Sequence, residues 1–387
     1  MFDPPHLDSI APAGAIGSRK PSARPGPKTQ PPRRRFFEFF AGSGLVTQGF
    51  KGIFDPVWAN DVCKKKTAVY TANHGETHFS HGPIERVNGA DLPQAPLAWA
   101  SFPCQDISLA GLVEGIHATR SGLVWEWLRV IDEMPKRPTV LVAENVAGLV
   151  SLNEGAHYRA LHQSLVERGY HVGAMLINAD RWVPQSRQRV FVVAIDARSL
   201  LPLSLTSSSY NWLHPVSVRR AAHGLPGWIW WSMPQPPKRQ SSLADIVEWN
   251  AETQDPKAQQ RNLSLISPRH ASTLESLPAN ERLAVPGYKR TRNGKQVLEL
   301  RFDNIAGCLR TPEGGSSRQL LVLRQNGGLR CRLLTVRETA RLMGAPDTYK
   351  IPGSYNDGYK AMGDGVAVPV ARWLAKHLLS PLVKTNA

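Results

Sequence analysis

The sequence contains few cysteines and no long hydrophobic run. Only four of its 387 residues are Cys, and they lie far apart without a Cys-x-x-Cys pair. This scarcity argues against a disulfide framework or a zinc ribbon and favours a reducing compartment. No apolar run approaches the roughly 20 residues of a membrane span, and the N-terminus lacks a secretory pattern. We therefore expect a cytoplasmic protein with no membrane partner.

Acidic residues are also scarce. The chain has 47 Lys and Arg residues against 31 Asp and Glu residues, a formal charge of +16. Residues 1–35 hold seven basic and two acidic residues among many prolines, and we expect a disordered basic tail there. The remaining chain is basic as well. Such a balance indicates a polyanionic partner, although a solvated basic surface would give the same composition.

From residue 36 onward, the sequence alternates between short apolar runs and helical patterns. This alternation over residues 36–196 predicts an α/β fold with a doubly wound, mostly parallel sheet. Residues 197–330 are rich in Pro, Ser, Arg and Trp and predict a second, smaller, irregular domain, in which KRTRNGKQ reads as a hairpin with an Asn-Gly turn. Residues 331–387 return to helical patterns that complete the first domain. Thr335 and Glu338 form a capping-box pattern there.

A glycine-bearing turn follows the first predicted strand. Gly42, Gly44 and Gly49 do not match the dinucleotide-binding pattern G-x-G-x-x-G, and a plain strand-to-helix turn would explain them equally well. Asp61 ends the second predicted strand, where a carboxylate suits ribose hydroxyls. Together they indicate a nucleotide-like ligand at this edge of the sheet.

Cys104 follows Pro103 at the end of the third predicted strand, the edge at which α/β sheets bind their ligands. A small buried filler is the alternative interpretation, because buried cysteine is common and usually inert. The segment after Cys104, residues 105–122, contains three glycines and little periodicity, which is typical of a mobile catalytic loop.

Polar residues also flank two later strands. Glu144 and Asn145 follow TVLVA, where a carboxylate is either a helix cap or an acid beside the cysteine. Arg187 and Arg189 alternate before VFVVAI and either steady an anion or belong to a solvated charge run. The three histidines of residues 74–81 lack a zinc-site spacing, and we expect no metal.

Taken together, these segments resemble the DNA (cytosine-5)-methyltransferase family. The matching motifs occur in the family's order: FFEFFAGSG, the PCQ of SFPCQDIS, ENVAGL, QSRQR, RLLTVRETARLMGAPDTY and GDGVAVPV. The resemblance implies a Rossmann-like class I methyltransferase fold, with residues 197–330 as the target-recognition domain. It also implies a monomer that acts on double-stranded DNA and associates with the nucleoid.

The resemblance further implies methyl transfer from S-adenosylmethionine to C5 of a flipped cytosine. Cys104 matches the nucleophile that adds to C6, and Glu144 matches the acid at N3. The other residues matched to the catalytic motifs are Asn145, Gln105, Arg120, Arg187 and Arg189. The residues matched to cofactor binding are Phe40, Ala41, Gly42, Gly44, Asp61, Ile84, Pro103, Leu123 and Val366.

Two departures from the family pattern concern the cofactor. Pro83 stands where an Asp often contacts adenine, and Asp364 gives the closing motif an extra carboxylate. Two alternatives remain beside the DNA enzyme, namely a tRNA cytosine-5 methyltransferase and an inactive DNA-binding regulator. The sequence leaves open the recognised DNA site, a preference for hemimethylated DNA and a cognate restriction endonuclease as partner.

Overall fold

The computed structural model describes Met1 and residues 34–103, 122–252, 255–278, 282–310, 318–325 and 327–386. The predicted tail therefore lies almost wholly outside the described residues. Residues 104–121 lie outside them as well, and with them three predicted catalytic residues, Cys104, Gln105 and Arg120.

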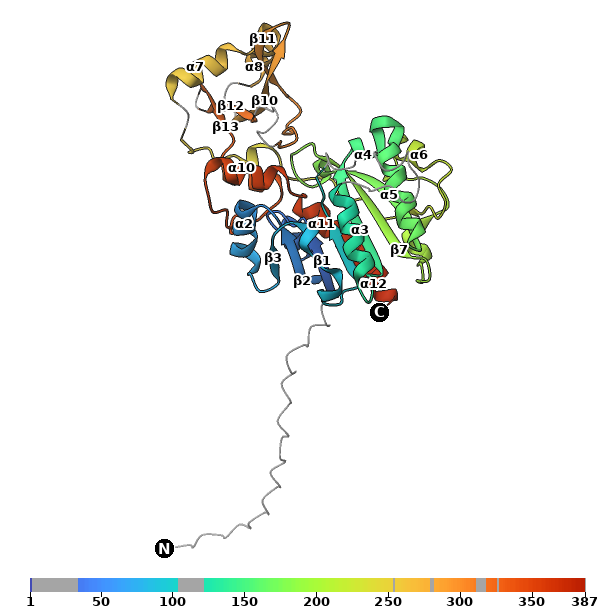
Figure 1. Ribbon diagram of the computed structural model, residues 1–387. Helices are drawn as coiled ribbons and strands as arrows, with labels where there is room; N and C mark the ends of the chain where they lie inside the picture. The colour runs from blue at the N-terminus through green and yellow to red at the C-terminus, as the bar shows by residue number, and fades with distance from the viewer. Residues whose placement is uncertain are drawn as a thin grey trace. The chain divides into compact units, whose positions relative to one another are not determined.

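A seven-stranded sheet forms the centre of the larger part, with the strand order β3-β2-β1-β4-β5-β7-β6 (Figure 1). Its strands are β1 (Arg34–Phe39), β2 (Phe54–Asp61), β3 (Phe79–His81), β4 (Leu97–Ala100), β5 (Val140–Val146), β6 (Tyr170–Asn178) and β7 (Gln188–Asp196). Neighbouring strands are parallel except that β7 runs antiparallel to both β5 and β6. The prediction of a mostly parallel sheet is confirmed.

Helices cover both faces of this sheet because successive side chains of a strand point to opposite faces. In β1, Phe36 packs with α1 (Leu45–Phe50), α11 (Val368–Leu374) and α12 (Ser380–Thr385). Phe37 packs on the other face with α3 (Leu123–Glu133) and α5 (Ala156–Glu167). The carboxyl ends of the strands thus remain the edge on which loops converge.

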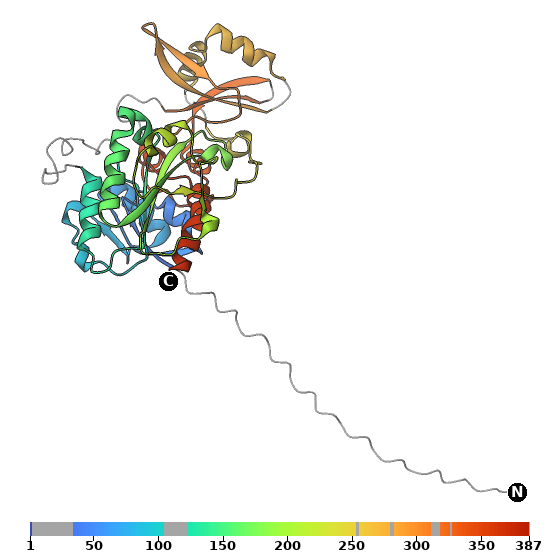
Figure 2. The same cartoon turned by 90° about the vertical axis from the view of Figure 1, so that its right-hand side faces the viewer.

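The smaller part contains a four-stranded antiparallel sheet with the order β11-β10-β12-β13 (Figure 2). Its elements are β10 (Leu283–Arg292), β11 (Lys295–Leu300), β12 (Leu320–Gln325), β13 (Gly328–Leu333), α7 (Pro256–Ser264) and α8 (Pro268–Ser276). Leu263 of α7 and Leu274 of α8 pack on the apolar side of the sheet. The second, smaller domain is confirmed, but it is more regular than its weak periodicity predicted.

Two local predictions are also confirmed. Asn293 and Gly294 have φ values of 50° and 74° and turn the chain from β10 into β11, as the Asn-Gly pair predicted. Thr335 and Glu338 form the capping box of α9 (Val336–Leu342). The remaining α-helices and strands are α2 (Lys64–His74), α4 (Gly148–Ser151), α6 (Val216–Ala222), α10 (Tyr355–Gly363), β8 (Thr206–Ser207) and β9 (Trp230–Trp231).

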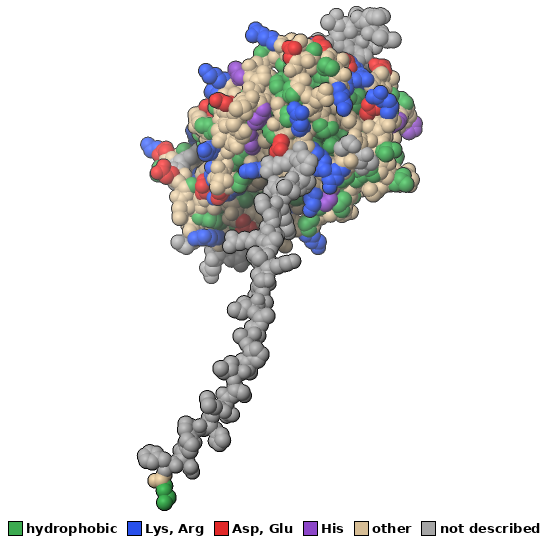
Figure 3. Space-filling model, turned by 90° about the horizontal axis from the view of Figure 1, so that it is seen from below, with side chains coloured by type: hydrophobic (Ala, Val, Ile, Leu, Met, Phe, Trp, Pro, Cys, Tyr) green, Lys and Arg blue, Asp and Glu red, His purple; other side chains and the backbone are tan. Residues whose placement is uncertain are grey.

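The basic residues do not form one continuous patch on the face shown in Figure 3. Lys and Arg side chains are spread over that face among Asp and Glu side chains. Among the described residues, no helix is long and apolar enough to cross a membrane.

Candidate active site

The glycine turn lies directly after β1 and is tied to the end of β2. Asp61 accepts the backbone N–H of Gly42 on Oδ2 at 2.8 Å and that of Cys63 on Oδ1 at 2.7 Å. Phe40, Gly42 and Gly44 all have positive φ values, of 54°, 56° and 77°. Glycine adopts this conformation without a steric penalty, whereas Phe40 is strained there, as residues at ligand sites often are.

His74 and Tyr349 support this turn through hydrogen bonds, and we call these two side chains the brace. His74 Nε2 lies 2.9 Å from the carbonyl oxygen of Gly44 and 3.1 Å from the hydroxyl of Tyr349. Because Tyr349 donates its own proton to the carbonyl of Ser43, His74 must be the donor to both oxygens. Burial lowers the pKa of His74 to about 4, so the imidazole is neutral near pH 7. A Cβ on Gly44 would lie only 2.6 Å from His74 Cδ2 and 2.8 Å from Tyr70 Cδ2.

Glu38 is a buried acid that the sequence reasoning missed. It lies one residue before the carboxyl end of β1 with 1% of its surface exposed and accepts a hydrogen bond from Thr47. Burial is the main reason that its pKa rises to about 8, and the charge of Asp61 contributes. The signal was present, because a single acid interrupts the apolar run FFEFF.

The other predicted cofactor residues lie near the carboxyl edge of the sheet. Ile84 is 2% exposed, and its carbonyl accepts a hydrogen bond from Arg129 of α3 at 3.2 Å. Leu123 begins α3, while Pro103 is exposed beyond the end of β4. Val366 is buried, with 2% of its surface exposed.

Glu144 and Asn145 hold the segment that leads to Cys104. Asn145 Nδ2 donates to the carbonyl oxygen of Phe102 at 3.0 Å. Glu144 is 6% exposed and accepts a hydrogen bond from Ser101. Two polar residues at the end of β5 therefore fix the two residues that precede Pro103 and Cys104. The helix-cap interpretation of Glu144 has no support among these contacts.

Glu144 is also paired with a predicted arginine. Arg189 Nε lies 3.1 Å from Glu144 Oε1, and both side chains are largely buried. Burial raises the pKa of Glu144 above its ordinary value, although Arg189, Arg187 and Ser101 partly oppose the rise. A carboxyl in this environment holds a proton at higher pH than a free glutamic acid.

Arg187 is more deeply buried than Arg189 and joins separate segments of the chain through hydrogen bonds. Its side chain is 1% exposed and donates from Nη2 to the carbonyls of Gly363 and Gly365, each at 2.7 Å, and from Nη1 to Leu309 at 3.2 Å. Nη1 also lies 3.4 Å from the sulfur of Cys308. It thus ties the start of β7 to the closing motif and to the smaller domain.

Cys308 is a second residue that the sequence reasoning missed. Arg189 Nη1 lies 4.0 Å from its sulfur. Burial alone would raise the pKa of Cys308, but the positive charges of Arg187 and Arg189 bring it below the ordinary value. No local pattern identified this thiol, because the residues around it come from distant parts of the chain.

The extra carboxylate of the closing motif has a partner. Lys66 Nζ of α2 lies 2.5 Å from Asp364 Oδ2. Pro83 precedes a short helical turn at Ile84–Arg86 and contributes no donor of its own. Among the described residues, no group of three His, Cys, Asp or Glu side chains is placed to hold a metal ion.

The chain is similar in sequence to several known proteins. The family model described as C-5 cytosine-specific DNA methylase matches residues 34–380. The type II methyltransferase M1.ScrFI of Lactococcus lactis subsp. cremoris is 25% identical over 371 residues, which cover 95% of this chain and 84% of that protein. The type II methyltransferase M.HhaI of Haemophilus parahaemolyticus is 26% identical over 354 residues, covering 90% and 95%.

Solved structures support the fold alone. The S. pombe Dnmt2 methyltransferase has a TM-score of 0.58 at 18% identity and covers 91% of this chain and 99% of its own. The Entamoeba histolytica methyltransferase EhMeth has a TM-score of 0.60 at 12% identity and covers 89% and 97%.

Proposed function

Because the chain belongs to the C-5 cytosine-specific DNA methylase family, we propose that it transfers a methyl group from S-adenosylmethionine to C5 of a cytosine in double-stranded DNA. The named relatives are type II methyltransferases and support the same reaction. The observation that carries the proposal is the attachment of Asn145 to Phe102, since it sets the segment before Cys104 beside the acid Glu144.

The turn after β1 fits the cofactor. Each oxygen of Asp61 accepts one backbone N–H and keeps lone-pair capacity for ribose hydroxyls. The Cβ position of Gly42 meets no described atom closer than Lys66 Cδ at 3.9 Å, so the front of the turn is open. S-adenosylmethionine, when bound there, supplies an electrophilic methyl group.

The protein's own residues then act on the cytosine, which must leave the duplex at a cost of a few kcal/mol. The thiolate of Cys104 adds to C6, and the new S–C6 bond moves electron density to C5. Glu144 donates its proton toward N3 and offsets the developing negative charge. After methyl transfer the C5 proton leaves, the S–C6 bond breaks, and Cys104 is free again.

The test measures transfer of labelled methyl groups to duplex DNA and, in parallel, to tRNA. Cys104→Ala should abolish transfer to DNA while leaving DNA binding intact. Cys331→Ala is the matched control, because burial raises the pKa of that thiol to about 11 and makes it unreactive. Full activity of Cys104→Ala would refute the mechanism, and transfer to tRNA alone would favour the RNA enzyme.

A second experiment traps the adduct. Duplex DNA carrying 5-fluorocytosine at the target should add covalently to the wild-type protein and not to Cys104→Ala, as intact mass would report. Turnover on cytosine without an adduct on 5-fluorocytosine would contradict the addition step.

Three further expectations belong to the same proposal. The enzyme acts as a monomer in the cytoplasm, where it associates with the nucleoid, whether or not a cognate restriction endonuclease accompanies it. Residues 36–196 and 331–387 form its catalytic domain, and residues 197–330 form its target-recognition domain.

A further inference from the structure

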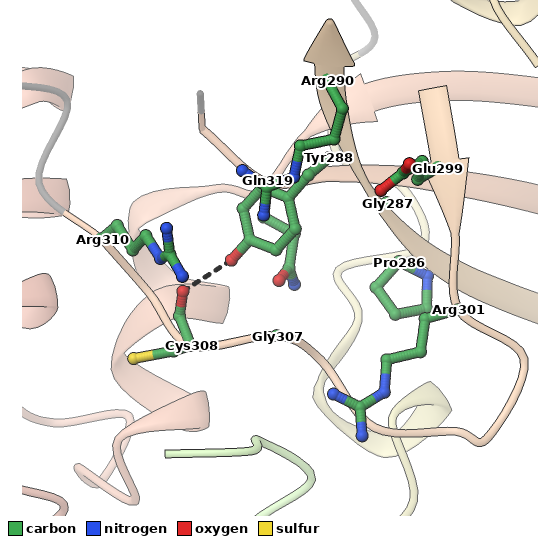
Figure 4. A pocket seen from close by; sticks show the side chains of 10 residues that line it. All are labelled: Pro286, Gly287, Tyr288, Arg290, Glu299, Arg301, Gly307, Cys308, Arg310 and Gln319. Atoms are coloured by element: carbon green, nitrogen blue, oxygen red, sulfur yellow. Dashed lines mark hydrogen bonds between the residues drawn. The ribbon is translucent and has the colours of Figure 1, made fainter. Parts of the chain in front are cut away.

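A cavity of about 210 Å³ lies in the smaller part of the molecule, between β10, β11 and the segment around Cys308 (Figure 4). Three arginines line it, Arg290, Arg301 and Arg310, together with Tyr288 and Gln319. None of them belongs to the motifs that the sequence analysis assigned to catalysis or cofactor binding.

Gln319 is the most informative residue of this cavity. Its main chain is held on both sides, because its N–H donates to the hydroxyl of Tyr359 at 3.1 Å and its carbonyl accepts from Leu334 at 3.3 Å. Its side chain is fully buried, and neither Oε1 nor Nε2 has a hydrogen-bond partner in the described part of the chain. Figure 4 shows the amide pointing into the cavity. Leaving a buried polar group unpaired costs about 1–3 kcal/mol, so the amide is poised for an external partner.

The neighbouring residues are fixed around this amide. Tyr288 donates its hydroxyl proton to the carbonyl of Cys308 at 2.6 Å. The guanidinium of Arg290 lies 5.1 Å from the centre of the Tyr288 ring, in a cation–π contact that orients its planar donors. A Cβ on Gly307 would come within 2.5 Å of the Tyr288 ring and 3.2 Å of Gln319 Oε1, so only glycine allows this approach.

The mixture of donors and acceptors favours a nucleobase over a phosphate. A phosphate oxygen accepts hydrogen bonds, so a phosphate site needs donors alone. This cavity adds the unpaired acceptor Oε1 of Gln319 to its arginines, whereas the carboxylate of Glu299 already accepts a hydrogen bond from Arg292 at 2.6 Å. The edge of a base presents donors and acceptors side by side, and Gln and Arg are the side chains that bind adenine and guanine edges bidentately.

The cavity also adjoins the proposed cytosine site. Cys308 lines it, and its sulfur lies 3.4 Å from Arg187 Nη1 and 4.0 Å from Arg189 Nη1. Arg189 in turn is paired with Glu144. One residue therefore separates the cavity from the catalytic arginines, which suits a base close to the target cytosine.

We propose that this cavity reads one base of the recognised DNA sequence, with Gln319 and Arg290 as specificity-determining residues. The proposal rests on the proposed function, because it assumes a DNA substrate whose cytosine reaches Glu144.

The experiment methylates a duplex library with randomised positions around a cytosine and reads the products by bisulfite sequencing. It compares the wild type with Gln319→Leu, which removes both polar atoms, and Arg290→Lys, which keeps the charge but loses the planar fork. Arg269→Lys is the matched control, since Arg269 is exposed on α8 and does not line the cavity. Both cavity variants should relax the preference at one position about tenfold or more, as the loss of a bidentate base contact does.

Two results would overturn the proposal. An unchanged sequence preference in both variants would remove the reading role. A uniform loss over all sequences, with a weaker salt dependence of binding, would assign the cavity to a phosphate instead. Thermal melting checks the fold, and Arg290→Lys decides alone if Gln319→Leu does not fold. A wild-type protein that methylates no duplex would refute the proposed function, a result that is visible without any variant.

Discussion

Replacing Gly44 with Ala should weaken cofactor binding much more than the same change at Gly75. Both glycines have positive φ values, +77° and +82°, but their ψ values differ, at 24° and 171°. The left-handed backbone costs an alanine about 1–2 kcal/mol at Gly44. The conformation of Gly75 is one that glycine alone adopts readily, so the backbone cost at this control position is at least as large. The two positions differ in the room available around the new Cβ atom. The new Cβ would lie 2.6 Å from His74 Cδ2 at Gly44, whereas no described atom lies within 4 Å of it at Gly75. Overpacking of this kind costs about 1–3 kcal/mol more.

The contact at Gly44 cannot be relieved by moving the imidazole alone. His74 Nε2 is hydrogen-bonded to Gly44 and to Tyr349, so a swing of the ring would leave buried carbonyl and hydroxyl oxygens without their donor. The turn itself must shift, and the hydrogen bond from Gly42 to Asp61 shifts with it. Because 1.4 kcal/mol corresponds to a factor of ten, the steric part predicts a rise in the cofactor Kd of roughly five- to 150-fold.

Calorimetric titration with S-adenosylmethionine measures the Kd, and urea unfolding measures the stability of each variant. Equal Kd values for Gly44→Ala and Gly75→Ala would refute the argument from the brace.

Three other predictions follow from buried ionisable groups. Glu144→Gln should lower turnover about 10²–10⁴-fold. Because the pKa of Glu144 is raised, the wild-type rate should fall as the pH rises through that pKa. A wild-type rate that does not depend on pH would contradict this expectation. Glu38, whose pKa is about 8, holds a proton that the unfolded chain releases near pH 4.5. Its contribution to stability is therefore complete below that pH and lost up to about pH 8, by at most about 1.4 kcal/mol per pH unit, and Glu38→Gln should flatten this slope in urea melts. Arg332→Met should cost about 3–5 kcal/mol in the same melts, because it leaves the buried carboxylate of Glu338 without its bidentate partner; a smaller loss would show that water reaches the site.

The larger sheet could be predicted well from the sequence because each of its strands has a recognisable local pattern. Apolar runs such as TVLVAENV are short, end in polar residues and are followed by helical periods. The antiparallel direction of β7 is not visible in VFVVAID, which reads like any buried strand. This direction could nonetheless have been predicted from the length of the connection. Residues 179–187 are too few to form the crossover that a parallel pair of β6 and β7 would need.

The smaller sheet was harder to predict because its pairing is not local. β10 contains Pro286 and Gly287, both unusual inside a strand, and it pairs on one side with β12, which begins only at Leu320. Periodicity within a window of ten or fifteen residues cannot detect such a pairing. Only the hairpin from β10 to β11 carried a local signal, the pair Asn293-Gly294.

In the candidate site, too, local features could be predicted from the sequence and long-range contacts could not. Asp61 and Glu144 lie at strand ends, where sequence order alone placed them at the ligand edge. Their supporting residues could not be found this way. Tyr349 reaches the carbonyl of Ser43 across 306 residues of chain, and no spacing rule connects the two.

The departure at Asp364 is best understood together with Lys66. Taken alone, the extra carboxylate predicted a changed electrostatic field around a positively charged cofactor. The ammonium of Lys66 lies 2.5 Å away, and both side chains are mostly shielded from solvent, at 17% and 29% exposure. At such a distance the field of the pair falls off much faster than that of a single charge. The turn before Val366 is therefore nearly neutral, and Lys66→Ala or Asp364→Asn would each leave one charge of the pair without its partner.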